Sequence, residues 1–254
     1  MGYLLDNLRK LPGWFRSPAT TRHYLNRALW ESGYPWTLIH PTPLEELFPG
    51  IETRAEPIEL FHPFQRRRGT TLELEELVVL VATAHHVQAR RIVEVGTFDG
   101  NTALNLACGV GDGGEVVTID LPPSAPAAGY STSAGPVPFE RRQYVGHPLE
   151  SRIRQVYGDS ATLDWSALGA PFDLAFIDGD HTSAYVESDT RNALSVLKPG
   201  GVVVWHDYEW RPVSRVLDRA VERGERIRWI RGTRLAMGIF KTPSSAARHF
   251  QLRA

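Results

Sequence analysis

Residues 91–107 read as a strand, a glycine turn and a helix in that order, and this stretch of the 254-residue chain constrains the fold most strongly. Residues 92–95 are mostly β-branched, as in a buried strand. Gly96 and Gly100 follow, and Asn101 or Thr102 can cap the next helix. Glycines let backbone approach a ligand closely, and a helix N-terminus offers unpaired N–H groups. The order predicts a nucleotide-binding crevice, although two glycines could also simply close a tight turn.

Strands and helices alternate along the rest of the chain. We expect helices at residues 71–87, 185–197 and 212–223, and strands at 115–120, 154–157, 172–178 and 202–205. Residues 226–230 and 235–240 are two more strands, and their link is so short that they form an antiparallel hairpin. The pattern predicts an α/β fold with a doubly wound, mostly parallel sheet of about seven strands and a reversed edge strand.

Composition divides the chain into a core and appended pieces. Residues 1–70 are rich in aromatic residues and proline, and we expect a helical N-terminal extension that packs on the core or forms a lid or substrate wall. Residues 71–242 form the predicted ligand-binding domain. Within it, the Pro-, Gly- and Ser-rich residues 122–149 predict a mobile insertion loop whose last part orders over a ligand. Residues 243–254 are predicted to be a frayed C-terminal tail.

Charge and cysteine content argue against several classes of function. The formal net charge is −1, which disfavours nucleic-acid binding as the main activity. The single cysteine, Cys108, excludes a disulfide framework and fits a reducing cytoplasm. No apolar run approaches the ~18 residues of a membrane span, and the first residues lack the features of a signal peptide. We therefore expect a cytoplasmic protein with a small-molecule partner; a homo-oligomer is compatible with the aromatic-rich extension.

Acidic residues stand at the ends of the predicted strands. Asp120 lies 24 residues after Gly96 at the tip of the second strand, where an acid is placed to bind ribose hydroxyls. Asp159 follows the third strand and could pair with an adenine amino group or cap the following turn. Asp178 and Asp207 end the fourth and fifth strands. Because ligands bind beyond the carboxyl ends of parallel strands, we expect these acids to surround one site.

Four motifs occur together in one order: Glu94-Val-Gly-Thr-Phe-Asp-Gly100, Asp120, Phe176-Ile-Asp-Gly-Asp-His181, and Leu197-Lys-Pro-Gly-Gly201 before a strand that ends in Asp207. Each is weak alone, but as a set, over about residues 70–240, they make the chain resemble the class I S-adenosylmethionine-dependent methyltransferases. The motif Ile-Asp-Gly-Asp-His is similar to that of a subfamily with metal-dependent sugar O-methyltransferases of macrolide pathways and cephalosporin-hydroxylase-like proteins. The resemblance implies a Rossmann-like fold.

The resemblance also implies that S-adenosylmethionine is the cofactor. Glu94 and the turn at Gly96 would face its methionine part, Asp120 would hold its ribose, and Asp159 with Ser160 would lie near its adenine. The complete set of implied cofactor-binding residues is Glu94, Gly96, Thr97, Phe98, Gly100, Asn101, Thr102, Asp120, Asp159, Ser160 and Asp178.

A catalytic centre with a divalent metal, Mg²⁺ or another, is implied as well. Asp178 and Asp207 match the acids that hold Mg²⁺ in metal-dependent relatives, and His181 matches the proposed general base of the sugar methyltransferases. Hard oxygen ligands suit Mg²⁺, and a bound metal would lower the pKa of an acceptor hydroxyl so that the oxygen attacks the methyl group. The implied catalytic residues are therefore His181 and Asp178.

The third protein ligand of this metal stays open. Catechol-type relatives follow the second acid with Asn, and Tyr208 stands there in this chain. We assign His206 as the third ligand, while Asp180, Glu209 or water could serve instead. In the alternative interpretation no metal binds: Asp178 and Asp207 are only hydrogen-bonded, and His206 is a structural histidine with hydrogen-bond partners.

Several functions compete. The leading hypothesis is metal-assisted O-methyl transfer to a hydroxyl of a sugar or glycosylated natural product, and transfer to a catechol-like small aromatic uses the same chemistry. A nicotinamide dehydrogenase is disfavoured, because the turn reads Gly96-Thr-Phe-Asp-Gly100 and the dinucleotide fingerprint requires Gly-x-Gly-x-x-Gly. A non-catalytic S-adenosylmethionine-binding module is the last alternative, and the intact acids and histidine of the catalytic centre argue against it.

Overall fold

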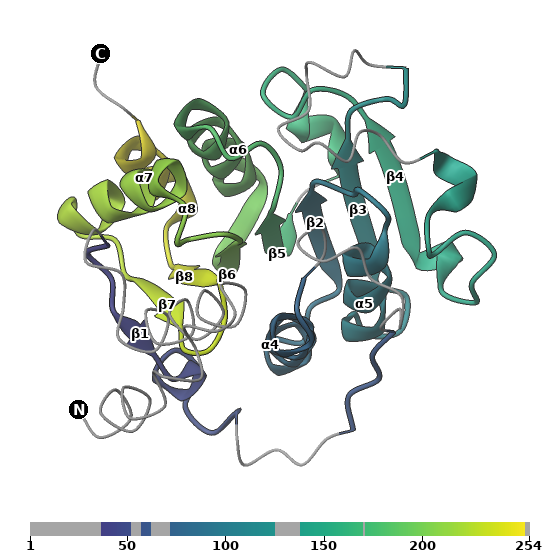
Figure 1. Ribbon diagram of the computed structural model, residues 1–254, viewed down its shortest axis with the longest axis horizontal. Coiled ribbons are helices and arrows are strands. Elements are labelled where there is room, and N and C mark those ends of the chain that lie inside the picture. Colours follow the sequence, from purple (N-terminus) through teal and green to yellow (C-terminus); the bar gives the residue numbers. More distant parts are fainter. Residues whose placement is uncertain (1–36, 52–56, 62–71, 125–137, 170, 252–254) are drawn as a thin grey trace, which may run out of the picture.

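A computed structural model describes residues 37–51, 57–61, 72–124, 138–169 and 171–251. In this part of the chain, one sheet of eight strands lies between two layers of helices (Figure 1). The strands are β1 (Pro41–Thr42), β2 (Arg91–Val95), β3 (Glu115–Asp120), β4 (Ile153–Tyr157), β5 (Phe172–Ile177), β6 (Leu197–Trp205), β7 (Ile227–Ile230) and β8 (Ala236–Phe240). The α-helices are α4 (Leu74–His86), α5 (Asn101–Gly109), α6 (Ser183–Val196), α7 (Arg211–Glu222) and α8 (Pro243–Ala246).

The strand order is β1-β7-β8-β6-β5-β2-β3-β4, and β8 pairs antiparallel with both β6 and β7. The doubly wound, mostly parallel sheet is therefore confirmed. Two details of the prediction were wrong. The described sheet has an eighth strand, because residues 41–42, which lie in the predicted N-terminal extension, pair with β7. The reversed strand β8 lies inside the sheet rather than at its edge. The chain first forms β7 one position further out and then returns to insert β8 between β7 and β6.

Both faces of the central strands are buried. In β2, Ile92 packs in a cluster with Leu80 of α4 and Leu106 of α5, and all three side chains are 0% exposed. The next residue, Val93, points to the opposite face and shares a cluster with Leu194 of α6. Successive strand residues point to opposite faces, so a strand that is covered on both sides is a nearly continuous apolar run. This burial positions the strand ends at which the polar residues lie.

The start of α5 differs from the prediction. Gly100 is the N-cap residue, with a φ of 77°, and the backbone N–H of Asn101 donates to the carboxylate of Asp99 at 3.0 Å. Neither Asn101 nor Thr102 caps the helix, because both already lie within its first turn. The first turn of α5 therefore follows directly from a left-handed glycine, a conformation that costs other residues free energy.

The appended pieces are partly described. Most of the predicted N-terminal extension, residues 1–36, 52–56 and 62–70, lies outside the described residues, as do residues 125–137 of the insertion loop. The last part of that loop packs on the core, where Tyr144 is 1% exposed. The predicted fraying of the C-terminal tail was wrong up to Gln251, because Phe250 is 1% exposed and stacks on Trp205 with ring centroids 5.9 Å apart.

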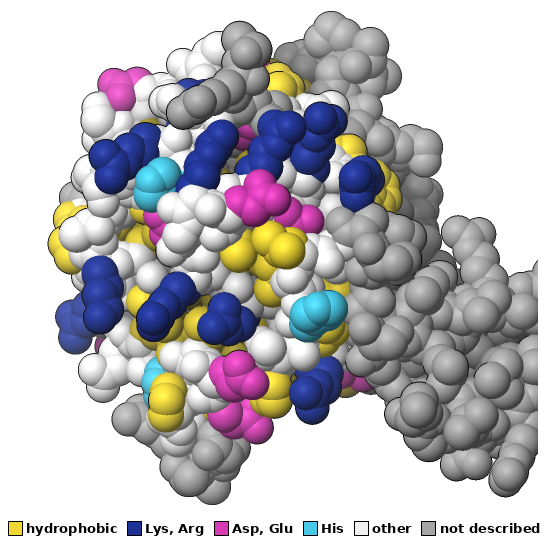
Figure 2. Space-filling view, turned by 90° about the vertical axis from the view of Figure 1, so that its left-hand side faces the viewer, with side chains coloured by type: hydrophobic (Ala, Val, Ile, Leu, Met, Phe, Trp, Pro, Cys, Tyr) yellow, Lys and Arg dark blue, Asp and Glu magenta, His cyan; other side chains and the backbone are white. Residues whose placement is uncertain are grey.

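The face that carries α7 and β7 bears arginine side chains interspersed with acidic and apolar ones (Figure 2). Exposed arginines there include Arg211, Arg215, Arg226 and Arg231. This face thus carries charges of both signs. Among the described residues, no helix combines the length and apolar character that crossing a bilayer requires.

Asp189 is a buried acid on α6 that provides a test of the fold. Burial raises the pKa of its carboxyl to about 7, the Ser160 hydroxyl partly offsets this, and the charges of Asp159 and Asp180 raise it further. Because this pKa is higher in the folded than in the unfolded chain, the folded state binds the proton more tightly. Stability is therefore lost as the pH rises from about 4 to about 7.

At pH 8 we expect Asp189→Asn to be more stable than the wild type, because Asn does not ionise. The free energy of unfolding measured in urea should be higher by on the order of 2–4 kcal/mol. The difference should shrink on lowering the pH to 5. Asp112→Asn, at an exposed acid, serves as the control. An advantage of equal size at both pH values would contradict the assignment of this pKa to Asp189.

Candidate active site

The glycine turn between β2 and α5 lies against the end of β5. Gly96 has a φ of +95°, and a Cβ atom there would come within 2.1 Å of the Asp178 carbonyl oxygen. Gly100 has a φ of +77°, and a Cβ atom there would come within 2.6 Å of the Tyr144 ring. Only glycine fits either position without a shift of neighbouring atoms. The glycine turn and the end of β5 are therefore in direct backbone contact.

Glu94 lies beneath this turn and is 0% exposed. Its Oε2 accepts a hydrogen bond from the Thr118 hydroxyl at 2.5 Å, and the hydroxyls of Thr118 and Thr97 are 2.6 Å apart. Burial raises the pKa of Glu94 to about 8, an effect that the Thr118 hydrogen bond reduces and the charge of Asp178 increases. Glu94 Oε1 is buried without a hydrogen-bond partner among the described residues. A cofactor that brings a hydrogen-bond donor to this atom fits the site.

Asp120 ends β3 at the same edge, as the spacing predicted. Its Oδ1 accepts from the Leu121 N–H at 2.9 Å, and its Oδ2 forms an ion pair of 2.9 Å with Arg142. The guanidinium of Arg142 is buried, and no motif in the sequence pointed to it. Phe98, in the turn between Gly96 and Gly100, adopts a φ of 47°, a conformation that is rare for a bulky residue.

The remaining predicted cofactor residues have structural partners. Asp159 caps its own turn, accepting from the Ala161 N–H at 2.9 Å, and it also accepts from the Tyr185 hydroxyl at 3.3 Å. The carbonyl oxygen of Ser160 accepts from Trp165 Nε1 at 2.9 Å. The Asn101 side chain donates to the Phe61 carbonyl at 2.9 Å, and Thr102 lies in the first turn of α5. The turn-capping interpretation of Asp159 is thus observed, and its adenine contact stays a prediction.

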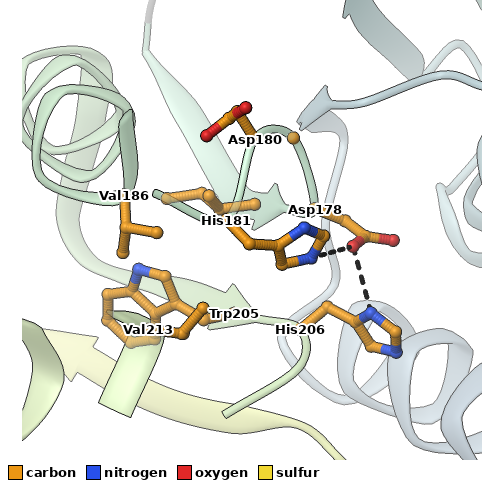
Figure 3. Close-up of a pocket in the computed structure, with 9 residues that line it drawn as sticks. Asp178, Asp180, His181, Val186, Trp205, His206 and Val213 are labelled. Carbon is orange, nitrogen blue, oxygen red and sulfur yellow. Dashed lines mark hydrogen bonds and ion pairs between the residues drawn. The ribbon is translucent and has the colours of Figure 1, made fainter. Parts of the chain in front are cut away.

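The predicted catalytic residues gather beyond the ends of β5 and β6. Asp178, His181, His206 and Asp207 each offer one ligand atom, and these atoms lie within 4.8 Å of one another. Figure 3 shows Asp178 between the two imidazoles: its Oδ1 is 3.0 Å from His206 Nδ1 and 3.6 Å from His181 Nε2. His181 Nε2 is also 3.0 Å from Asp207 Oδ2. The pocket beside these residues is lined by Ile177, Asp178, Gly179, Asp180, His181, Val186, Trp205, His206 and Val213.

Asp207 is held in an unusual backbone conformation. Its φ is +51°, in the left-handed region that non-glycine residues rarely adopt. The Tyr208 N–H donates to the Arg234 carbonyl at 3.0 Å, and the Trp210 N–H donates to the Asp207 carbonyl at 2.8 Å. Such outliers concentrate at functional sites, where surrounding bonds hold them in place.

Glu76 and Arg234 lie beside the predicted catalytic residues, and no motif in the sequence pointed to either of them. Glu76, on α4, is 1% exposed; its Oε2 is 3.3 Å from His206 Nε2 and accepts from Arg234 Nη2 at 2.9 Å. Arg234 Nη1 in turn donates to Asp207 Oδ1 at 3.1 Å. Burial would raise the pKa of Glu76, but the bonds and charges of His206 and Arg234 outweigh it and hold that pKa well below its usual range.

The carboxylates raise the proton affinity of both histidines. Burial lowers the pKa of His181, but Asp178 and Asp207 outweigh it and raise this pKa to about 9. The pKa of His206 is raised well above its usual value, because Asp178, Asp207 and Glu76 outweigh its burial. These shifts favour the protonated form of both rings, whose positive charges would compensate the acids around them.

The donor set also fits a divalent cation. Carboxylates and imidazoles together are ligands of first-row transition metals, whereas Mg²⁺ prefers oxygen ligands alone. Of the candidates for the third ligand, His206 is in the cluster. Tyr208 points elsewhere, since its hydroxyl donates to Asp218 at 2.5 Å, and Asp180 accepts from the Thr182 N–H at 2.7 Å.

Comparison with known proteins identifies relatives of this chain. A family model described as a methyltransferase domain matches residues 93–208. The catechol O-methyltransferase of Mycobacterium tuberculosis is 32% identical over 127 residues, which cover 49% of this chain and 51% of that protein. The catechol O-methyltransferase domain-containing protein 1 of Mus musculus is 26% identical over 149 residues, covering 58% and 53%. The chain thus spans about half the length of the curated relatives it matches.

A solved structure supports the fold. The O-methyltransferase from Bacillus cereus in complex with SAH aligns with a TM-score of 0.53 at 19% identity, covering 68% of this chain and 84% of that chain. At this identity the likeness concerns the fold alone.

Glu76 provides a test of the buried charges. We expect Glu76→Gln to destabilise the protein by about 3 kcal/mol or more in urea unfolding, because Arg234 and His206 lose the charge that compensates them. Glu75→Gln, at an exposed position on the same helix, is the matched control. Equal effects of the two variants would show that the buried ion pairs do not contribute to stability.

Proposed function

Because the chain contains a methyltransferase domain of the class I, S-adenosylmethionine-dependent kind, we propose that it transfers a methyl group from S-adenosylmethionine to a hydroxyl oxygen of a small molecule. The contact between Gly96 and the Asp178 carbonyl carries this proposal, because it joins the glycine turn to the cluster of acids and histidines. A cofactor on the turn and an acceptor at the cluster would then be neighbours. Proximity and in-line orientation supply much of the acceleration of a transfer reaction.

In the proposed complex, two buried acids recognise the cofactor. Glu94 Oε1, which lacks a partner among the described residues, would accept from a donor in the methionine part. Asp120 would accept from ribose hydroxyls, since each of its oxygens retains acceptor capacity beside its present bond. Asp159 and Ser160 would lie near the adenine. These roles follow the family pattern at matching positions.

In the proposed metal-assisted form, Asp178, His206 and Asp207 would hold the cation. When bound, a divalent cation lowers the pKa of a hydroxyl that it contacts and stabilises the resulting oxyanion. The mixed carboxylate and imidazole donors favour Mn²⁺, Fe²⁺, Co²⁺ or Zn²⁺ over the Mg²⁺ expected from the family pattern. Glu76 would orient His206 through its second ring nitrogen, as carboxylates commonly do for metal-binding histidines.

His181 is the proposed general base. Its Nε2 faces Asp178 and Asp207, whose charges raise its proton affinity. A group that takes a proton from an acceptor hydroxyl requires such affinity, but it must itself start neutral. In the metal-bound state the charges of the two carboxylates would be partly compensated, which would bring the pKa of His181 back toward neutrality.

The acceptor is proposed to carry a hydroxyl beside an apolar or planar surface. Trp210 is 50% exposed, and its ring centroid lies 4.9 Å from that of His181. An aromatic face beside the base suits a sugar ring, as the motif around His181 suggests. It suits a small aromatic diol as well, and the names of the curated relatives favour this second candidate. Parallel assays with a glycosylated hydroxyl compound and a catechol would separate the two.

Calorimetry tests the cofactor assignment. We expect S-adenosylmethionine to bind at least about tenfold tighter than NAD, because the glycines of the turn do not have the Gly-x-Gly-x-x-Gly spacing of the dinucleotide fingerprint. S-adenosylhomocysteine should bind in the same range as S-adenosylmethionine. Tighter binding of NAD would overturn the proposed function.

Metal removal tests the catalytic centre. With an accepted substrate, we expect EDTA to abolish turnover and Asp207→Asn to lower kcat at least about tenfold, while the Kd of S-adenosylmethionine changes less than about threefold. Asp112→Asn, at an exposed acid, should keep the wild-type rate. Full activity after EDTA treatment would refute the metal-assisted form, and a metal-free transfer with His181 as base would then stand alone.

A further inference from the structure

Residues 138–149, called the strap below, fold against the cofactor half of the site. The strap includes the short helix η4 (Phe139–Arg141) and leads into η5 (Glu150–Arg152). Gln143 donates its backbone N–H to the Asp99 carbonyl at 2.8 Å and its side-chain Nε2 to Asp99 Oδ2 at 2.7 Å. Tyr144 lies on Gly100, as described above. The strap is thus docked on the glycine turn itself.

Arg142 connects the strap to the end of β3. Its side chain is 1% exposed, and its Nη2 is 2.9 Å from Asp120 Oδ2. Its Nη1 donates to Gln155 Oε1, and its guanidinium lies over the Tyr157 ring at 5.4 Å from the centroid. The Leu121 N–H binds the other oxygen of Asp120 at 2.9 Å. Both oxygens of this carboxylate are therefore held, and the side chain is fixed in one orientation.

The same residues connect to Glu94. Gln155 Nε2 donates to the Thr97 hydroxyl at 3.2 Å, and that hydroxyl is bonded to Thr118, which donates to Glu94. A continuous hydrogen-bonded chain thus runs from Arg142 beneath the glycine turn to the buried acid. Because hydrogen-bond networks couple their members, the strap can set the geometry of the whole cofactor half.

An aspartate that binds a ribose must present both oxygens to two neighbouring hydroxyls at once. Without a brace, binding would have to order its side chain, and this ordering weakens affinity. Arginine suits such a brace, because its planar fork offers several donors in fixed directions. Burial also raises the pKa of Asp120, and the adjacent Arg142 opposes this and favours the ionised acceptor.

We propose that Arg142 is a positioning residue for cofactor recognition, which holds the Asp120 carboxylate in the orientation that accepts from the two ribose hydroxyls. This rests on the proposed function, because it requires that a ribose binds at Asp120. The strap thereby acts as part of the cofactor site. Arg142 itself contacts the Asp120 carboxylate and would not contact the methyl group that the cofactor donates.

Calorimetry on the full chain tests this role with two probes, S-adenosylhomocysteine and its 2′-deoxy analogue. The wild type should bind the first at least about tenfold tighter, because a hydrogen bond to a charged acceptor is lost in the second. In Arg142→Met we expect the affinity for S-adenosylhomocysteine to fall at least about tenfold and that for the analogue less than about threefold. The ratio of the two affinities then approaches one. Arg142→Lys should give an intermediate ratio, since lysine keeps the charge but lacks the fork.

Arg141→Met, at the exposed neighbouring arginine of the strap, is the matched control and should leave both affinities unchanged. Equal weakening of both probes in Arg142→Met would mean that Arg142 only stabilises the fold, and it would overturn the proposal. If circular dichroism shows that Arg142→Met is unfolded, an unchanged ratio in Arg142→Lys overturns it instead. A wild type that binds S-adenosylhomocysteine without discriminating the analogue also overturns it, whereas a wild type that binds neither probe refutes the proposed function.

Discussion

The contact of the glycine turn with the end of β5 is the constraint on which the rest of the site depends. Gly96 touches the carbonyl of Asp178 so closely that no side chain fits between them. The switch point of a doubly wound sheet brings these two strand ends together, because β2 pairs with both β3 and β5. In the proposed function, this single approach of two backbones places the methyl donor on one side and the acceptor on the other.

Charge compensation is the second constraint on the acceptor side. Glu76, Asp178 and Asp207 lie around His206, and Glu76 and Asp207 also bind Arg234. Glu76, His206 and Asp207 are buried. Unpaired charges in such a place would be costly; the surrounding carboxylates favour the protonated form of His206, and the guanidinium of Arg234 bonds two of the acids. Two charged imidazoles carry the same charge as one divalent cation. The three acids can therefore be compensated either by two protonated imidazoles or by one divalent cation beside neutral imidazoles.

The sequence allowed the strand ends to be predicted, because their signals are local. Asp120, Asp178 and Asp207 each lie within two residues of the end of an apolar run, and the structure places each at the carboxyl edge. The residues that brace them could not be predicted: Glu76 and Arg234 are 158 positions apart, and their pairing depends on how α4 docks beside β8. The two-residue strand β1 was missed for a similar reason, since Pro41 and Thr42 carry no strand pattern and pair with β7 only in the folded sheet.

Each half of the site is braced by an arginine from outside the parallel strands. Arg142 comes from the strap and holds Asp120, and Arg234 precedes β8 and holds Asp207. Strands buried on both faces are rigid, but backbone pairing does not fix the side-chain torsions of an acid at a strand end, so its carboxylate can rotate. A buried arginine with several acceptors removes that freedom through geometry as well as charge, which lysine would not do. The sheet thus sets where the two halves meet, and the segments outside the parallel strands set how accurately each carboxylate points.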